Sequence, residues 1–257
     1  MKVKGGISAP VSGPMNLTGK VAIVTGSARG IGRATCVALA REGADIIACD
    51  MLPVEETLVE VQKQNCQAIA LKCDVSAPDQ VAKVVERAVK AFGKIDILVN
   101  NAGVMGKTGI PIEKITLNDW DFHLSINLKG TFLFCQAVWP IMVKQGLGKI
   151  VCIGSIAGKI GGVLAGPDYC ASKGGIHAMV KCLAKRGVTA GIYVNGIAPG
   201  PIRTRMTKDE PYKDEMVPLG RLGEPEDIAE AVVFLVSPAS NFITGIILDV
   251  NGGMSMT

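Results

Sequence analysis

Short apolar runs rich in β-branched residues alternate with amphipathic stretches from residue 21 to the end of the chain. The runs have the length of buried strands, and the stretches between them repeat apolar residues at helical spacing. The predicted strands span residues 21–25, 45–49, 67–72, 95–100, 149–154, 193–197 and 246–249. The predicted helices lie near residues 30–42, 54–64, 78–91, 118–137, 168–186 and 225–236.

This alternation predicts an α/β fold of the Rossmann type. Strands and helices that alternate so regularly form a parallel sheet through right-handed crossovers, with helices on both faces. No linker, repeat or shift in composition divides residues 17–257, so we expect one domain, preceded by a loose arm at residues 1–16. Ligands of such sheets bind at the carboxyl ends of the strands. The residues directly after each strand are therefore the candidates for binding and chemistry.

Composition narrows the classes of function. Of the 257 residues, 48% are hydrophobic and 19% are charged, which is typical of a globular protein and excludes a disordered chain. The 27 basic and 23 acidic residues are scattered and give a net charge of only +4, so we expect no nucleic-acid partner. No run approaches the roughly 18 apolar residues that span a bilayer, so we expect no membrane partner.

The eight cysteines are dispersed, without a C-x-x-C pair, and the two histidines, His123 and His177, are far apart. This pattern predicts small buried thiols in a reducing cytoplasm rather than disulfides. It also predicts that the chain holds no metal ion.

A glycine-rich turn follows the first predicted strand. Gly26, Gly30 and Gly32 stand between that strand and the first helix. Glycines let the backbone turn sharply and approach a phosphate, whose charge the N-terminus of the following helix stabilises. Asp50 follows the second strand, 18 positions after Gly32, where a carboxylate can accept both hydroxyls of an adenosine ribose. These features predict dinucleotide binding.

The choice between NAD and NADP depends on two residues of opposite charge. Asp50 would repel a 2′-phosphate, whereas the guanidinium of Arg29 beside the glycine turn can pair with one. Residues 51–53 add no second positive charge. We therefore predict NAD and keep NADP as the alternative.

Candidate chemistry lies at Tyr169 and Lys173, which share one face of a predicted helix because they are four residues apart. A phenol has an unperturbed pKa of about 10, and a nearby ammonium favours the phenolate. Ser155 follows the strand at 149–154, where its hydroxyl can bind a substrate oxygen. Asn127 interrupts an apolar helical stretch, and a buried amide there needs a partner.

Taken together, these motifs resemble those of the short-chain dehydrogenase/reductase family, from about residue 17 to residue 253. The motifs are Thr25-Gly-x-x-x-Gly30-x-Gly32, Asp74-Val75, Asn100-Asn-Ala-Gly103, Asn127, Ser155, Tyr169-x-x-x-Lys173 and Pro199-Gly200-Pro-Ile-Arg-Thr204. The resemblance implies a single-domain Rossmann fold with a seven-stranded parallel sheet, a homotetramer, and a catalytic group formed by Asn127, Ser155, Tyr169 and Lys173.

The resemblance also implies a role for each of these residues. Tyr169 would exchange a proton with the substrate, Lys173 would lower the tyrosine pKa and bind the nicotinamide ribose, and Ser155 would hold the substrate oxygen. Asn127 would keep a water in a proton relay to Lys173. The implied cofactor contacts are Gly26, Ser27, Arg29, Gly30, Ile31, Gly32, Asp50, Met51, Asp74, Val75, Asn101, Ala102, Gly103, Tyr169, Lys173, Pro199, Gly200, Ile202 and Thr204.

The substrate is expected between residues 155–168 and a lid at residues 203–220. The predicted substrate contacts are Ser155, Ile156, Val163, Tyr169 and Met206. These apolar, glycine-rich segments suit a modest secondary alcohol or ketone, so we predict a cytoplasmic NAD(H)-dependent oxidoreductase of such compounds. The alternative is a 3-oxoacyl-[acyl-carrier-protein] reductase, which generally prefers NADPH. A catalytically silent regulator is a third reading, which the four intact catalytic positions disfavour.

Overall fold

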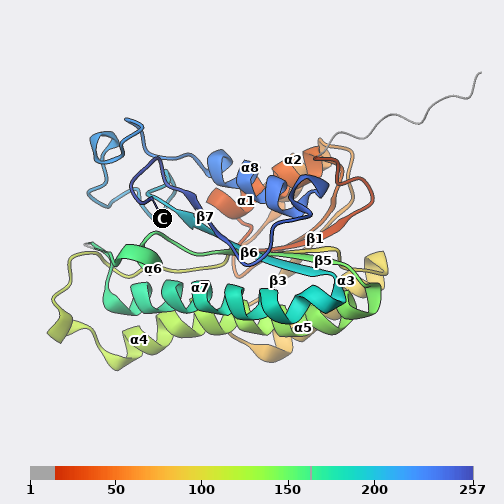
Figure 1. The fold of residues 1–257 in the computed structure, drawn as a ribbon, viewed down its shortest axis with the longest axis horizontal. Helices are drawn as coiled ribbons and strands as arrows, with labels where there is room; N and C mark the ends of the chain where they lie inside the picture. The colour runs from red at the N-terminus through yellow and green to blue at the C-terminus, as the bar shows by residue number, and fades with distance from the viewer. Residues whose placement is uncertain (1–14, 163, 257) are drawn as a thin grey trace, which may run out of the picture.

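The computed structural model describes residues 15–162 and 164–256, and it contains one sheet of seven parallel strands (Figure 1). The strand order is β3-β2-β1-β4-β5-β6-β7, and every neighbouring pair is parallel. The strands are β1 (Val21–Thr25), β2 (Asp45–Asp50), β3 (Ala68–Lys72), β4 (Ile97–Asn100), β5 (Gly148–Ile153), β6 (Ile192–Pro199) and β7 (Ile247–Val250). The predicted fold class is confirmed, and each predicted strand is present to within two residues at either end.

Helices cover both faces of the sheet (Figure 1). One face carries α1 (Gly30–Arg41), α2 (Glu55–Gln62) and α8 (Pro225–Val236). The other carries α3 (Pro78–Phe92), α5 (Gly130–Gln145) and α7 (Pro167–Gly187). The remaining helical segments are α4 (Leu117–Leu124), α6 (Ala157–Ile160), a π-helical segment (Ser125–Lys129) and 3-10 turns at Ile112–Lys114, Val188–Ala190, Asp214–Met216 and Pro238–Ser240.

Two apolar clusters form the core, one on each face of the sheet. Successive residues of β1 alternate between them: Ala22 and Val24 belong to the cluster under α1 and α8, and Val21 and Ile23 to the cluster under α3, α5 and α7. Burial on both sides explains why this strand is apolar throughout rather than alternating with polar residues.

The segment Leu117–Gln145 forms one long helical stretch, which continues past the predicted end at residue 137 and past Pro140. By length and composition this stretch could span a membrane, contrary to the sequence expectation that no run would. In the fold, however, Phe134, Val138 and Met142 are fully buried against the sheet. That burial is what the core helix of a globular domain shows.

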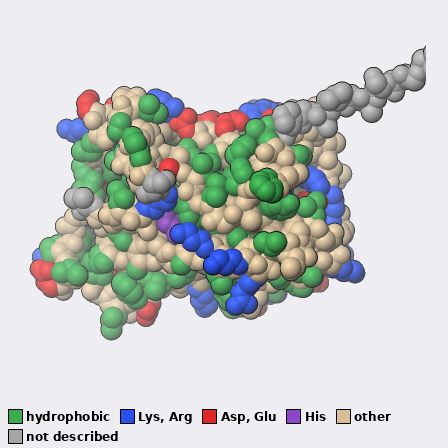
Figure 2. Space-filling model, viewed as in Figure 1, with side chains coloured by type: hydrophobic (Ala, Val, Ile, Leu, Met, Phe, Trp, Pro, Cys, Tyr) green, Lys and Arg blue, Asp and Glu red, His purple; other side chains and the backbone are tan. Residues whose placement is uncertain are grey.

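The chain enters the domain slightly earlier than the sequence indicated. Met15, which the prediction assigned to the loose arm, packs against the core, and the Ser237 hydroxyl lies 3.3 Å from its sulfur. Residues 1–14 of that predicted arm lie outside the described residues. Figure 2 shows both signs of charge on one face of the domain, with apolar side chains between them.

Candidate active site

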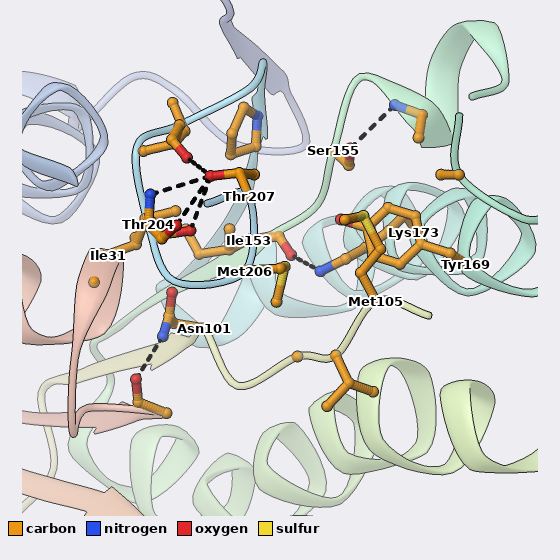
Figure 3. A pocket seen from close by; sticks show the side chains of 18 of the residues that line it. Ile31, Asn101, Met105, Ile153, Ser155, Tyr169, Lys173, Thr204, Met206 and Thr207 are labelled. Carbon is orange, nitrogen blue, oxygen red and sulfur yellow. Dashed lines mark hydrogen bonds between the residues drawn. The ribbon is translucent and has the colours of Figure 1, made fainter. Parts of the chain in front are cut away.

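A cavity of about 770 Å³ opens at the carboxyl ends of β1, β2, β4, β5 and β6 (Figure 3). Each of these strands ends in or is followed by residues that line it, such as Gly26, Asp50, Asn101, Ser155 and Pro199. All of the predicted cofactor contacts line the cavity except Ser27 and Gly32. Among the described residues, no group of three or more His, Cys, Asp or Glu side chains is arranged to hold a metal ion.

Ser27 is fully buried and points away from the cavity. Its hydroxyl donates to the Cys49 carbonyl at 3.2 Å, and its own carbonyl accepts the Thr57 hydroxyl at 2.7 Å. The side chain therefore fastens the turn after β1 to β2 instead of facing a ligand, and the backbone carbonyl of Ser27 fastens the same turn to α2. The motif places Ser27 next to Gly26 in sequence, but sequence alone does not show which way the side chain turns.

Gly32 supports the turn through close packing rather than by lining the cavity. A Cβ at this position would lie 2.1 Å from the Gly26 carbonyl oxygen and 2.6 Å from Nδ2 of Asn101. The same amide nitrogen donates to the carbonyls of Thr25 and Gly26 at 2.9 and 3.0 Å. Gly26 itself has a φ of +63°, a conformation that favours glycine. The turn therefore fits a bound pyrophosphate only if both positions lack side chains.

Replacing Gly32 with alanine is expected to force this turn open. The overlap with the Gly26 backbone should destabilise the fold by roughly 3 kcal/mol and weaken NADH binding at least about tenfold. Thermal unfolding and a fluorescence titration with NADH measure the two effects. Gly174→Ala is the matched control, because a Cβ there would meet only the Gly158 carbonyl oxygen at an ordinary 3.5 Å. Equal NADH affinity in Gly32→Ala and the wild type would contradict the assigned role.

Asp50 lies at the carboxyl end of β2, where its carboxylate is fixed by two backbone groups. One oxygen accepts the N–H of Ala28 and the other accepts the N–H of Leu52, both at 2.9 Å. Asp50 and Arg29 both line the cavity. The carboxylate ends β2, and β1 and β4 separate this strand from β5, which precedes the tyrosine in the chain.

The predicted pair on α7 lies at the other end of the cavity (Figure 3). The Lys173 ammonium lies 5.7 Å from the centroid of the Tyr169 ring and donates to the carbonyl of Ile153 at 2.9 Å. Ser155 lies two residues beyond the end of β5, and its Oγ accepts the N–H of Ala157 at 3.1 Å. The helix and the end of β5 thus bring the phenol, the ammonium and the hydroxyl to one place.

The electrostatics of this pair differ from the sequence expectation. Removal from water raises the pKa of Tyr169 to about 12, and the hydrogen bond with Ser155 lowers it only in part. Burial also lowers the pKa of Lys173 to about 8. The expected lowering of the phenol pKa by Lys173 is therefore not seen in this structure, where burial of the phenol is the largest influence on that pKa.

Asn127 is fully buried and does not line the cavity. Its Oδ1 accepts the N–H of Val104 at 2.8 Å, and its Nδ2 donates to the Val104 carbonyl and to Ser172 Oγ at 2.9 and 3.0 Å. Asn127 lies in the π-helical segment, a type of bulge that is frequent at functional sites. A Cβ on Gly103 would lie 3.3 Å from this Oδ1 and 3.4 Å from Lys173 Nζ. The glycine therefore leaves the amide and the ammonium on either side of one small space.

Of the predicted substrate contacts, Ile156 and Met206 line the cavity, whereas Val163 lies outside the described residues. Met105, Tyr212 and Met254 also line the cavity; the prediction named none of them, although Tyr212 lies within the predicted lid at residues 203–220. They come from the loop after β4, from the segment 203–220 and from the C-terminal end. None of these segments repeats apolar residues at a helical or strand spacing, so the sequence does not show which of their side chains face the cavity.

His177 lies one helical turn after Lys173 and is 7% exposed. Its Nε2 has no hydrogen-bond partner among the described residues, and burial lowers its pKa to about 4. Between pH 6.5 and 4, the unfolded chain therefore binds a proton at His177 that the folded chain does not. The free energy of unfolding should fall by about 3 kcal/mol as the pH falls through this range.

Urea unfolding of the wild type and of His177→Gln at pH 7 and at pH 4.5 checks this expectation. The carboxylates titrate equally in both proteins, so the difference between the two pH dependences isolates His177. The variant should lose less stability on acidification than the wild type. An identical loss in the two proteins would show that His177 stays accessible to protons when folded.

The chain is similar to proteins of one family over nearly its whole length. The family model described as enoyl-(acyl carrier protein) reductase matches residues 26–255. A 3-oxoacyl-[acyl-carrier-protein] reductase of Thermotoga maritima is 40% identical over 250 residues, which cover 93% of this chain and 99% of the relative. The (2S)-[(R)-hydroxy(phenyl)methyl]succinyl-CoA dehydrogenase subunit of Thauera aromatica is 40% identical over 249 residues, covering 94% and 99%.

A solved structure leads to the same family. The crystal structure of a short-chain type dehydrogenase/reductase from Mycobacterium marinum superposes with a TM-score of 0.91 at 30% identity, covering 95% of this chain and 98% of the other. The chain therefore belongs to the short-chain dehydrogenase/reductase family and is an oxidoreductase that acts on CH–OH groups.

Proposed function

We propose that this chain is an NAD(H)-dependent oxidoreductase that interconverts a secondary alcohol and a ketone, with Tyr169 as the general acid/base. The observation that carries the proposal is the convergence of Tyr169, Ser155 and Lys173 at one end of a cavity whose other end holds Asp50. The glycine turn between these ends has the close packing that a pyrophosphate needs.

The chain's own groups would hold the reacting oxygen and move its proton. When bound, the nicotinamide supplies or accepts the hydride, and its oxidised form adds a positive charge. Ser155 Oγ holds the substrate oxygen beside the phenol. In the reducing direction the neutral Tyr169 donates its proton to that oxygen, and in the oxidising direction the phenolate accepts it. Lys173 Nζ, fixed on the Ile153 carbonyl, is the positive group that the chain itself places near the phenol.

NAD is the proposed cofactor because Asp50 presents a fixed negative charge where a 2′-phosphate would bind. Both carboxylate oxygens are held by backbone N–H groups, so the side chain does not move aside without losing two hydrogen bonds. Arg29 supports the alternative, NADP, because it lines the same part of the cavity.

The proposed substrate is a compact, uncharged ketone or its alcohol. Near Tyr169 the cavity is lined mainly by apolar side chains, namely Met105, Ile156, Ile160, Leu164, Met206 and Met216. The second candidate is a 3-oxoacyl-[acyl-carrier-protein] substrate, which the name of the Thermotoga maritima relative favours. The exposed Arg205 at the cavity is one cation that an acidic carrier protein could approach.

We further propose a cytoplasmic homotetramer. All eight cysteines are free in the structure, which supports a reducing compartment. Large apolar side chains are exposed on the surface, among them Leu117, Phe132 and Phe242, and they support association with further copies of the chain. Light scattering of the purified protein measures the assembly.

The function is tested by following oxidation of NADH and of NADPH with cyclohexanone, 2-octanone, ethyl acetoacetate and acetoacetyl-CoA. We expect the highest kcat/KM for NADH with one of the three compounds that carry no coenzyme A. This value should be at least about tenfold above that of any reaction with NADPH. A preference for acetoacetyl-CoA with NADPH would instead support the carrier-protein substrate. Failure of all four compounds with both cofactors would overturn the proposal.

A further inference from the structure

A buried pair of side chains, His123 and Asp168, lies beside the proposed catalytic group, outside the cavity lining. Each residue is 5% exposed, and Nδ1 of His123 lies 2.6 Å from Oδ2 of Asp168. The same Nδ1 lies 2.8 Å from the carbonyl oxygen of Asp119. Because both neighbours of Nδ1 are acceptors, this nitrogen carries the proton and donates it.

The pair joins the two helical elements that carry the catalytic residues. His123 lies in the last turn of α4, four residues before Asn127, and Asp168 lies in the first turn of α7, directly before Tyr169. The next pair along the two helices is Asn127 with Ser172, whose side chains are 3.0 Å apart. His123 and Asn127 are four residues apart, and so are Asp168 and Ser172. Residues four apart share one face of a helix, so the two contacts lie one turn apart between the same two helix faces.

The surroundings of the pair fix its geometry. Asp168 stands in the first turn of a 21-residue helix, where the helix dipole stabilises a negative charge, and His123 lies within the continuous helical stretch Leu117–Gln145. A Cβ on Gly106 would lie 3.0 Å from Cε1 of His123. The imidazole therefore also packs under the loop that bears Val104, the backbone partner of Asn127.

We propose that His123 and Asp168 are positioning residues for the general acid/base, a role that rests on the proposed function. The pair sets the start of α7 against the end of α4, so that the Tyr169 phenol keeps its place relative to Ser155, Lys173 and Asn127. Its contribution is to orientation, since neither side chain lines the cavity. Displacing a reacting group by about 1 Å is enough to cost roughly a hundredfold in rate.

The pair is tested by removing it whole and in parts. Asp168→Ala breaks the contact, and His123→Phe with Asp168→Ala removes both partners without leaving a buried charge. Asp168→Asn keeps an oxygen that can accept the Nδ1 proton. Asp96→Asn is the matched control, because Asp96 is a 7% exposed carboxylate that accepts the N–H of Val21 at the amino ends of β1 and β4, away from the cavity at the carboxyl ends of the strands.

We expect Asp168→Ala and the double variant to lower kcat by similar factors of about 10 to 100, with the NADH dissociation constant within threefold of the wild type. Asp168→Asn should recover most of the lost kcat. The rate is measured with NADH and the best ketone of the four named above. A folded double variant with kcat within twofold of the wild type, or a loss confined to KM, would overturn the positioning role.

Hydrogen–deuterium exchange gives a readout that needs no turnover. Amides of residues 104–106 and 168–173 should exchange faster in Asp168→Ala than in the wild type, while Asp96→Asn leaves them unchanged. If no ketone is reduced, the proposed function fails, and exchange alone then decides whether the pair holds α4 and α7 together. Unchanged exchange in Asp168→Ala would refute the inference whatever the enzyme's substrate.

Discussion

Replacing Tyr169 with phenylalanine should lower kcat by about a thousandfold, within the range of roughly 10² to 10⁴ that general acid–base catalysis contributes. The change removes only the hydroxyl, so the ring still fills its place on α7 and the cavity keeps its shape. The dissociation constant of NADH should therefore change little. Steady-state kinetics with the best ketone and a fluorescence titration with NADH separate the two quantities.

A second tyrosine provides the control for this replacement. Tyr193 lies on β6, outside the cavity lining, with the Lys149 ammonium 3.9 Å from its ring centroid. Tyr193→Phe deletes the same atom from another partly buried ring and should leave kcat within about twofold. If Tyr169→Phe behaves like this control, the phenol is not the acid/base and the proposed mechanism is wrong.

The pH dependence of the two directions should differ. Burial raises the pKa of Tyr169 to about 12, so at neutral pH the phenol is protonated and ready to donate to a ketone. Alcohol oxidation needs the phenolate, and its rate should therefore rise with pH throughout the interval from pH 6 to 10. Ketone reduction needs the protonated phenol, and its rate should stay nearly constant there because the whole interval lies below this pKa. Initial rates in both directions between pH 6 and 10 test this, and parallel profiles would contradict it.

The arrangement of the strands was predictable because a parallel sheet covered on both faces leaves a direct trace in the sequence. Val21 to Thr25 are all buried, so the strand reads as an uninterrupted apolar run. The ends of these runs indicated where the ligand would lie, and the structure places Gly26, Asp50 and Asn101 around one cavity. The spacing of Tyr169 and Lys173 likewise predicted a shared helix face, and the two groups do lie together.

What the sequence did not reveal depends on contacts between distant segments. The motif at residues 25–32 does not show that Ser27 turns toward Cys49, because that orientation depends on the neighbouring strand. The predicted helix ended near residue 137, but the buried Val138 and Met142 hold the helix on both sides of Pro140. The raised pKa of Tyr169 follows from the walls of the cavity, which no local motif encodes.

His123 illustrates the same limit. In the sequence it is one of two isolated histidines, and its separation from Asp168 along the chain matches no helical or strand period. Only the crossing of α4 and α7 brings the two side chains to 2.6 Å. A buried polar pair next to a reactive group becomes meaningful once the fold shows which elements it joins.

Changing Asp50 to asparagine should shift the cofactor preference from NADH toward NADPH by about 10² to 10³ in the ratio of kcat/KM values. Two like charges about 4 Å apart repel by roughly 4 kcal/mol at the effective dielectric of a protein surface, and each 1.4 kcal/mol is a factor of ten. Asparagine keeps the size of the side chain and one oxygen for the N–H of Ala28. The measured gain therefore reports mainly the removed charge.

Two further variants show where the gain comes from. Arg29→Ala in the Asp50→Asn background should abolish most of the improvement with NADPH, because the guanidinium is the cation available to a 2′-phosphate at this end of the cavity. Asp45→Asn is the matched control: it neutralises a carboxylate at the opposite end of the same strand, where Oδ1 accepts the N–H of Gln67. This control should leave the preference unchanged. A wild type that already prefers NADPH would contradict the proposed NAD preference, since Arg29 would then outweigh Asp50. The 3-oxoacyl-[acyl-carrier-protein] substrate would in that case become the better proposal.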